Sequence, residues 1–181
     1  MKFFTREKSR QSKFNKTDIT VSKKYSIMGG EFIFKCYPQS FFSKAEVEEL
    51  FDLAFKEVKR IEDKFTDFKS SEFNQINELA GISPCPVDQE VFDLIKKSIE
   101  ISKISKGRFD ISFASIGHLW RKAKERGESL SLYDRKSLKE FIDYKKIIMD
   151  EESLTVYLPS EKMRIGLGGI GKGYAVDQAY S

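Results

Sequence analysis

The residues best suited to chemistry in this sequence are five glycines and a lysine that lie close together near the C-terminal end. Residues 166–173 read GLGGIGKG, so Lys172 is flanked by residues without side chains. Glycines let the backbone approach a ligand closely and point successive N–H groups at an anion. A helix that begins directly after such a loop adds the positive end of its dipole. The segment therefore predicts a phosphate site, whereas one or two glycines alone would indicate only a tight turn.

Two common phosphate motifs match this segment only in part. Gly166, Gly168 and Gly171 satisfy the G-x-G-x-x-G pattern of dinucleotide-binding folds. That pattern calls for an acidic residue about 20 positions further on, which the sequence does not reach. Lys172 fits the G-x-x-x-x-G-K pattern of a P-loop, but Gly173 stands where that loop has the serine or threonine that holds magnesium. Both motifs also normally open a parallel sheet near the start of a domain.

The run GGIGKGYAVD, residues 168–177, resembles the glycine-rich signature of the ApbE-type flavin transferases. Three upstream segments follow the order of that family's motifs. They are Met28–Gly30, with glycine in place of the family's threonine, residues 65–77 with FTDF, SE and IN, and residues 107–120 with GRFDIS and LW. The four segments are colinear and cover residues 28–177.

This resemblance implies that the protein is an FAD:protein FMN transferase, an enzyme that moves FMN from FAD to a threonine of a target flavoprotein, such as a subunit of a redox-driven ion pump. AMP is released and the reaction needs Mg²⁺. A magnesium-dependent FAD pyrophosphatase is the alternative within the family, and a flavin-binding module without catalysis is the alternative outside enzymes. In the family, the acidic residue and hydroxyl that hold the metal lie in the C-terminal half. We therefore expect this chain alone to lack them, to be inactive or nearly so, and to contain no assignable catalytic residue.

The same resemblance implies where the flavin dinucleotide would be bound. Met28 would contact the flavin or the nucleotide, and Phe68 would stack on an aromatic ring of FAD. Arg108, Phe109 and Asp110 would line the nucleotide pocket, with Asp110 accepting a hydrogen bond from an adenine amino or ribose hydroxyl group. Without the resemblance, Phe68 reads equally well as a core residue, and Asp110 as a turn or cap residue.

In the glycine segment, the resemblance implies that Lys172 approaches the diphosphate and that Gly169 offers its backbone carbonyl to magnesium. Gly166 is also assigned to the cofactor site, although many family members have aspartate there. A side-chain contact to FAD is therefore missing at that position.

The elements that must position these residues mix helices and strands without regular alternation, which predicts an α+β fold of the ApbE type. An alternating run predicts a strand over residues 26–37. A capping box of Ser43 and Glu46 predicts a helix over about 44–63. Its apolar residues recur at spacings of three and four: Val47, Leu50, Ala54, Val58, Ile61 and Phe65. A second helix is predicted between Asp88 and Gly107.

The remaining segments are less regular. Residues 66–77 form a polar stretch, and residues 109–120 a short segment before a charged connection. A short helix is predicted from Asp134, a hairpin with strands at 146–149 and 154–158, and a third strand at 163–167. The helix that should start at Tyr174 has only about two turns before the end of the sequence. We therefore expect the fold to be truncated after the glycine-rich loop.

The positive charge of the sequence is concentrated at its start. The net charge is +4, of which residues 1–24 contribute +6, so that the remainder carries −2. A near-neutral body argues against a nucleic-acid partner, because phosphate-backbone affinity needs many clustered cations. We therefore expect residues 1–24 to be a basic flexible tail and residues 25–181 to be the N-terminal part of an ApbE-like FAD-binding domain.

The apolar stretches of the sequence are too short for a membrane span of roughly 18 residues, and none follows the cationic start as in a signal peptide. As written, the sequence predicts a cytoplasmic protein, and removal of a signal would instead make it periplasmic or membrane-anchored. Cys36 and Cys85 lack metal-ligand spacing and are predicted to be buried thiols. His118, the only histidine, is predicted to be structural or exposed.

Overall fold

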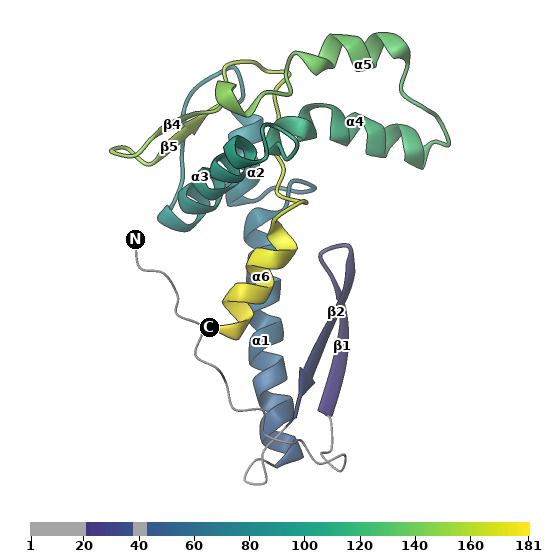
Figure 1. The fold of residues 1–181 in the computed structure, drawn as a ribbon, viewed down its shortest axis with the longest axis vertical. Coiled ribbons are helices and arrows are strands. Elements are labelled where there is room, and N and C mark those ends of the chain that lie inside the picture. Colours follow the sequence, from purple (N-terminus) through teal and green to yellow (C-terminus); the bar gives the residue numbers. More distant parts are fainter. Residues whose placement is uncertain (1–20, 38–42) are drawn as a thin grey trace. The chain divides into compact units, whose positions relative to one another are not determined.

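The structure, a computed structural model, describes residues 21–37 and 43–181 of the chain (Figure 1). The chain divides into two compact units, residues 1–53 and 54–181, which are described separately. Helices and strands are mixed, and this confirms the α+β class. The tail expected over residues 1–24 lies outside the described residues up to position 20. Residues 21–24 are part of a strand and not of a tail, and Val21 is buried in the first unit.

The first unit contains an antiparallel hairpin of β1 (Val21–Ile27) and β2 (Gly30–Cys36), in which Val21 pairs with Cys36 and Ile27 with Gly30. The strand predicted over 26–37 corresponds to β2 and the turn. Strand β1 was not predicted, because its lysines and serines obscure the alternation of apolar residues. Val21, Val47 and Phe51 form a small core, and Phe34 and the half-buried Cys36 pack against it. Cys36 is thus less buried than expected.

Met28 and Gly29 form the turn of this hairpin, and both have positive φ, 54° and 68°. Two-residue hairpin turns favour this left-handed geometry because it matches the twist of the strands. Glycine adopts it without cost, and asparagine tolerates it, but for a long side chain it is strained. Met28 is therefore held in a conformation that its own side chain disfavours.

We expect Met28→Asn to raise the free energy of unfolding by about 0.5–1 kcal/mol, because Asn-Gly is the preferred pair for this turn. Urea denaturation of the two proteins measures the difference. Met149→Asn is the matched control, since Met149 lies within a strand and should lose stability on the same change. A loss of stability in Met28→Asn equal to that of the control would contradict the turn strain.

Helix α1 (Lys44–Phe65) begins in the first unit and ends in the second. The capping box is confirmed: the Ser43 N–H donates to Glu46 Oε2 at 2.7 Å, and the Glu46 N–H donates to Ser43 Oγ at 3.3 Å. The predicted apolar face is displaced at one point. Leu50 is 52% exposed, and the neighbouring Phe51 is buried instead.

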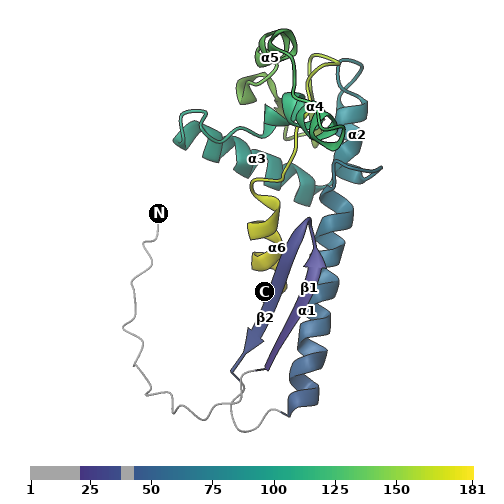
Figure 2. The ribbon, with the colours of Figure 1, turned by 90° about the vertical axis from the view of Figure 1, so that its right-hand side faces the viewer.

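The second unit holds the remaining elements (Figures 1 and 2). Its short sheet has the order β3-β5-β4, with antiparallel pairing. Its core includes fully buried side chains from α2, α3 and the segment before the glycines, among them Phe73, Phe92, Ile95 and Ile165. The elements are α2 (Glu72–Glu78), β3 (Cys85–Pro86), α3 (Gln89–Ile104), η1 (Ile111–Phe113), α4 (Ala114–Glu125), α5 (Leu132–Lys139), η2 (Tyr144–Lys146), β4 (Ile148–Asp150), β5 (Thr155–Tyr157) and α6 (Gly171–Tyr180).

The predicted helix after Asp88 and the hairpin are confirmed as α3 and β4–β5. Two helices were missed, α2 in the polar stretch and α4 in the segment 109–120 and the charged connection after it. Polar residues and Gly117 weaken their apolar periodicity. Helix α5 starts two residues earlier than predicted, at Leu132, and α6 three residues earlier, at Gly171.

The third strand predicted at 163–167 is wrong, because these residues join no sheet. The Ile165 N–H donates to the Asn77 side chain and the Gly166 N–H to the Ile111 carbonyl, where a strand would pair with a neighbouring strand. Cys85 is buried as expected. His118 is half-buried, its Nδ1 lies 2.9 Å from the Ala114 carbonyl oxygen, and burial lowers its pKa. No helix among the described residues is long and apolar enough to cross a membrane.

Candidate nucleotide site

The glycine segment is anchored at its start by one buried amide side chain. Asn77, on α2, is 5% exposed. Its Oδ1 accepts from the Ile165 N–H at 2.8 Å, and its Nδ2 donates to the Ile165 carbonyl at 3.0 Å. The next residue, Gly166, donates its N–H to the Ile111 carbonyl at 3.0 Å. Backbone groups that a sheet would otherwise pair are thus satisfied, and the loop leaves from a fixed position.

The start of α6 presents backbone N–H groups that have no hydrogen-bond partner within the helix. The N–H groups of Ile170 and Gly171 both donate to the Leu167 carbonyl, at 3.0 and 2.7 Å, and form a tight turn into the helix. Ile170 is the N-cap residue and provides no side-chain cap. The first-turn N–H groups, including those of Lys172 and Gly173, have no acceptor within the helix. Together with the helix dipole they favour an anion at this end.

The surroundings of this helix start leave room for a ligand. A Cβ atom added at Gly168 or at Gly173 would meet nothing within 4 Å. The Lys172 side chain is exposed and, among residues 21–37 and 43–181, forms no ion pair. An exposed ammonium group beside uncapped amides is suited to neutralise a phosphate. The predicted role of Lys172 thus stays a prediction with a compatible geometry.

The structure brings together Phe109 and Gly169, two residues that the sequence assigned to separate roles. A Cβ atom at Gly169 would lie 2.9 Å from Phe109 Cε2, so the ring rests against the glycine where any side chain would collide with it. Arg108, the preceding residue, has an exposed side chain, and its N–H donates to the Ser105 carbonyl at 3.2 Å. The glycine at 169 is therefore a packing requirement of this unit.

Asp110 has a structural role that the sequence offered as the alternative. Its Oδ1 accepts from the N–H and hydroxyl of Ser112 at 2.8 and 2.6 Å, and caps η1. Its Oδ2 accepts from the Tyr144 N–H at 3.0 Å. Both carboxylate oxygens are therefore engaged within the protein, and a contact to a nucleotide would use their remaining lone pairs.

Phe68 is not a core residue, since it is 76% exposed. The Arg121 guanidinium lies 4.4 Å from the centroid of its ring, and Arg121 Nη2 donates to Asp67 Oδ2 at 3.1 Å. A Cβ atom at Gly166 would lie 3.2 Å from that same Asp67 oxygen. Sequence reasoning assigned no role to Asp67 or Arg121, and no local pattern distinguishes Arg121 from the other cations around it. Met28 lies in the first unit, in the hairpin turn.

The described residues do not by themselves build a magnesium site. Magnesium prefers six oxygen ligands in octahedral geometry. Within the described ranges no group of three histidine, cysteine or acidic side chains could hold a metal ion. The Gly169 carbonyl assigned to the metal would be a single ligand, so its role remains a prediction.

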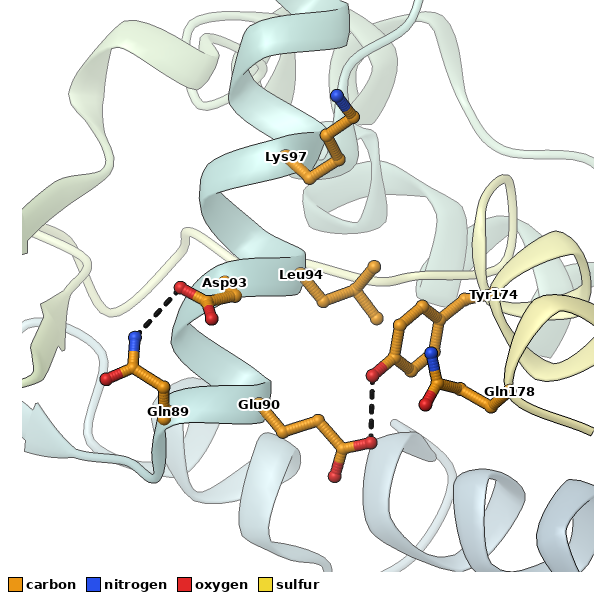
Figure 3. Close-up of a pocket in the computed structure, with 7 residues that line it drawn as sticks. All are labelled: Gln89, Glu90, Asp93, Leu94, Lys97, Tyr174 and Gln178. Atoms are coloured by element: carbon orange, nitrogen blue, oxygen red, sulfur yellow. Dashed lines mark hydrogen bonds between the residues drawn. The ribbon is translucent and has the colours of Figure 1, made fainter. Parts of the chain in front are cut away.

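A second feature of this unit is an open pocket of about 630 Å³ between α3 and α6 (Figure 3). Glu90, which lines the pocket, accepts four hydrogen bonds. They come from the Tyr174 hydroxyl at 2.8 Å, from two nitrogens of Arg60 at 2.7 and 2.8 Å, and from Lys64 at 2.7 Å. Burial and the Glu90 carboxylate raise the pKa of Tyr174. The residues that line the pocket are Gln89, Glu90, Asp93, Leu94, Lys97, Tyr174 and Gln178.

The hydrogen bond from Arg60, with that from Lys64, lowers the pKa of Glu90 from 4.5 to about 2. We expect Glu90→Gln to lower the free energy of unfolding by about 1–2 kcal/mol at pH 7. A lowered pKa stabilises the fold above the unfolded-state value and loses that effect as pH falls through the folded-state value. The difference between wild type and Glu90→Gln should thus be full above pH 4.5, shrink as the pH falls from 4.5 toward 2, and vanish below pH 2.

Denaturant unfolding of both proteins across this pH range measures the effect. Glu100→Gln is the control on the same helix, because its exposed pair with Lys97 at 3.4 Å contributes little. A Glu90→Gln difference that does not change with pH would show that the carboxylate charge is not the stabilising feature.

Comparison with known proteins gives matches over a range that contains the segments named above. The model of the ApbE family matches residues 28–181. An FAD:protein FMN transferase from Klebsiella pneumoniae (strain 342) is 28% identical over 153 residues, which cover 84% of this chain and 46% of that relative. The chain thus spans about half the length of the curated relative it matches.

Solved structures show the same fold. The ApbE protein from Thermotoga maritima is similar with a TM-score of 0.76 at 22% identity, over 89% of this chain and 51% of that one. The flavinyl transferase ApbE from Pseudomonas stutzeri, in its apo form, gives a TM-score of 0.74 at 20% identity, over 90% and 52%. The flavin transferase ApbE from Vibrio cholerae gives 0.75 at 15% identity, over 90% and 52%.

Proposed function

Because this chain belongs to the ApbE family, we propose that its protein is an FAD:protein FMN transferase, which moves FMN from FAD to a threonine of a target flavoprotein and releases AMP. The observation that carries the proposal is the uncapped start of α6 with the exposed Lys172 beside it. This arrangement favours a diphosphate. Dependence on Mg²⁺, and a target such as a subunit of a redox-driven ion pump, are parts of the same proposal.

In the proposed reaction the threonine oxygen attacks the phosphorus on the FMN side of the diphosphate. A new phosphorus–oxygen bond forms, the bond from that phosphorus to the bridging oxygen breaks, and AMP leaves with the bridging oxygen. The threonine proton passes to solvent. Negative charge grows on the phosphate oxygens. The Lys172 ammonium group and the first-turn N–H groups of α6 would stabilise that charge.

The other assigned residues would bind and orient the dinucleotide. The ring of Phe109, packed against Gly169, would hold the loop open for the diphosphate. The exposed ring of Phe68 would stack on a planar ring of FAD. Arg108 and Asp110 would complete the nucleotide contacts, and the contact that the resemblance implies for Met28 stays a prediction.

The proposal is tested by incubating the protein with FAD, Mg²⁺ and a target domain that carries an acceptor threonine. Transferred flavin fluoresces with the target after denaturing electrophoresis. The 181-residue chain by itself is expected to bind FAD but to transfer little or no flavin, because its described residues build no magnesium site. Absence of FAD binding would refute the proposed function. Substantial transfer by this chain alone would refute the need for further metal ligands, and AMP release without a target would indicate the pyrophosphatase instead.

A further inference from the structure

An arginine without an assigned role contacts the exposed ring of Phe68, and an aspartate without one pairs with that arginine. We call Asp67, Phe68 and Arg121 the Arg121 cluster. The Arg121 guanidinium lies 4.4 Å from the Phe68 ring centroid, well within the range of a cation–π contact. Phe68 is nevertheless 76% exposed, so the guanidinium leaves most of the ring in contact with solvent. A large aromatic ring held in this way offers a flat apolar surface to a ligand.

Asp67 holds the guanidinium by an ion pair. The Asp67 side chain is 13% exposed, and its Oδ2 accepts from Arg121 Nη2 at 3.1 Å. Arginine suits this arrangement because its planar group can hydrogen-bond at its edge and stack with its face. The contact restricts the orientations of the ring before a ligand binds, and such restriction reduces the entropy lost on binding.

The Arg121 cluster is joined directly to the glycine segment. Asp67 Oδ2 lies 3.2 Å from the position that a Cβ atom would take at Gly166, the first glycine of the segment. Asp67, the residue before Phe68, therefore lies beside the backbone that leads to the start of α6. A ligand that combines a planar ring with a diphosphate would use the Phe68 ring for the first and the start of α6 for the second.

We propose that Arg121 and Asp67 are positioning residues, which hold the Phe68 ring as a stacking surface for a planar ring of the flavin dinucleotide. This inference rests on the proposed function. Arg121 acts through Phe68 and need not touch the ligand. The stacked ring is either the isoalloxazine or the adenine, since both present the same flat π-surface.

The test is a titration of the 181-residue chain with FAD, followed by flavin fluorescence. Arg121→Gln should weaken FAD binding about threefold to tenfold, and Arg121→Lys by less, because an ammonium group keeps the charge but not the planar stack. Lys122→Gln is the matched control, since it removes an exposed cation next to Arg121 on α4 and should bind FAD as wild type does. Thermal unfolding of each variant reports whether the fold is retained.

A double-mutant cycle separates positioning from general stability. In the Phe68→Leu background, Arg121→Gln should have almost no further effect on FAD affinity, because the ring it positions is gone. Visible circular dichroism of bound flavin should also decrease in Arg121→Gln at saturating ligand if the isoalloxazine is stacked. Separate titrations with FMN and ADP identify the ring: the ligand whose affinity Arg121→Gln weakens carries it.

The outcomes distinguish the two proposals. If the unchanged chain does not bind FAD, the proposed function fails, and the positioning role fails with it. If the chain binds FAD and Arg121→Gln binds it equally well, only the positioning role is overturned. The same holds if Arg121→Gln weakens binding by the same factor with and without the Phe68 ring.

Discussion

Asn77→Ala is expected to lower the free energy of unfolding by about 2–4 kcal/mol. The substitution removes both partners of Ile165, whose N–H and carbonyl lie in the core and would be left without hydrogen bonds. Stranded buried backbone groups cost more than the bonds themselves contribute. The better helix propensity of alanine on α2 offsets only a small part of this loss. Urea denaturation followed by far-ultraviolet circular dichroism measures it.

Gln75→Ala is the matched control for this prediction, because Gln75 lies on the same helix and is exposed. It should change the free energy of unfolding by less than about 0.5 kcal/mol. Asn77→Ala should also weaken FAD binding where the fold persists, since the glycine segment loses its anchor. Equal stability of the two variants would mean that water replaces the Asn77 bonds and that the anchor is dispensable.

Lys172→Ala is expected to weaken FAD binding by about tenfold to a hundredfold, the range for a charge-assisted contact to phosphate. Substitution of an exposed side chain in the first turn of α6 should leave the stability of the fold nearly unchanged. The contact is ionic, so the affinity of wild type should fall as salt rises, and that of Lys172→Ala should fall less. Flavin fluorescence titrations at several salt concentrations measure both effects.

Riboflavin, which has no phosphate, separates this contact from the rest of the site. Its affinity should be the same for wild type and Lys172→Ala. Lys124→Ala removes an exposed cation of α4 and controls for the change in net charge. If Lys172→Ala binds FAD as wild type does, or loses riboflavin affinity to the same extent, the diphosphate does not lie at the start of α6.

Helix boundaries were predictable where local chemistry marks them. Ser43 with Glu46, and Asp88, provide side-chain caps whose hydrogen bonds are present in the structure, and the helices begin where those caps predict. Helix α2 was missed because its buried face includes amides, Asn74 and Asn77, which serve tertiary contacts and not helix periodicity. Its stability comes from packing that no local window of sequence contains.

The candidate site was predictable in its glycines but not in its long-range pairs. Arg121 lies 54 residues from Asp67, within a run of cations whose types are equivalent in the sequence. The glycine at position 166 has a physical reason that only the fold shows. A Cβ atom there would lie 3.1 Å from Ala114 Cβ and 3.2 Å from Asp67 Oδ2, so a side chain at this position would crowd both neighbours.

The Asn77 anchor also has a consequence for the order of events during folding. Asn77 and Ile165 are 88 residues apart, and their bonds close a long loop of chain. Closing such a loop costs entropy that only later contacts recover, and contacts of high sequence separation slow folding. On a ribosome, helices α1 to α3 can assemble while residue 165 is still unsynthesised. The glycine segment is therefore among the last parts of this unit to acquire its shape, after the helices that anchor it.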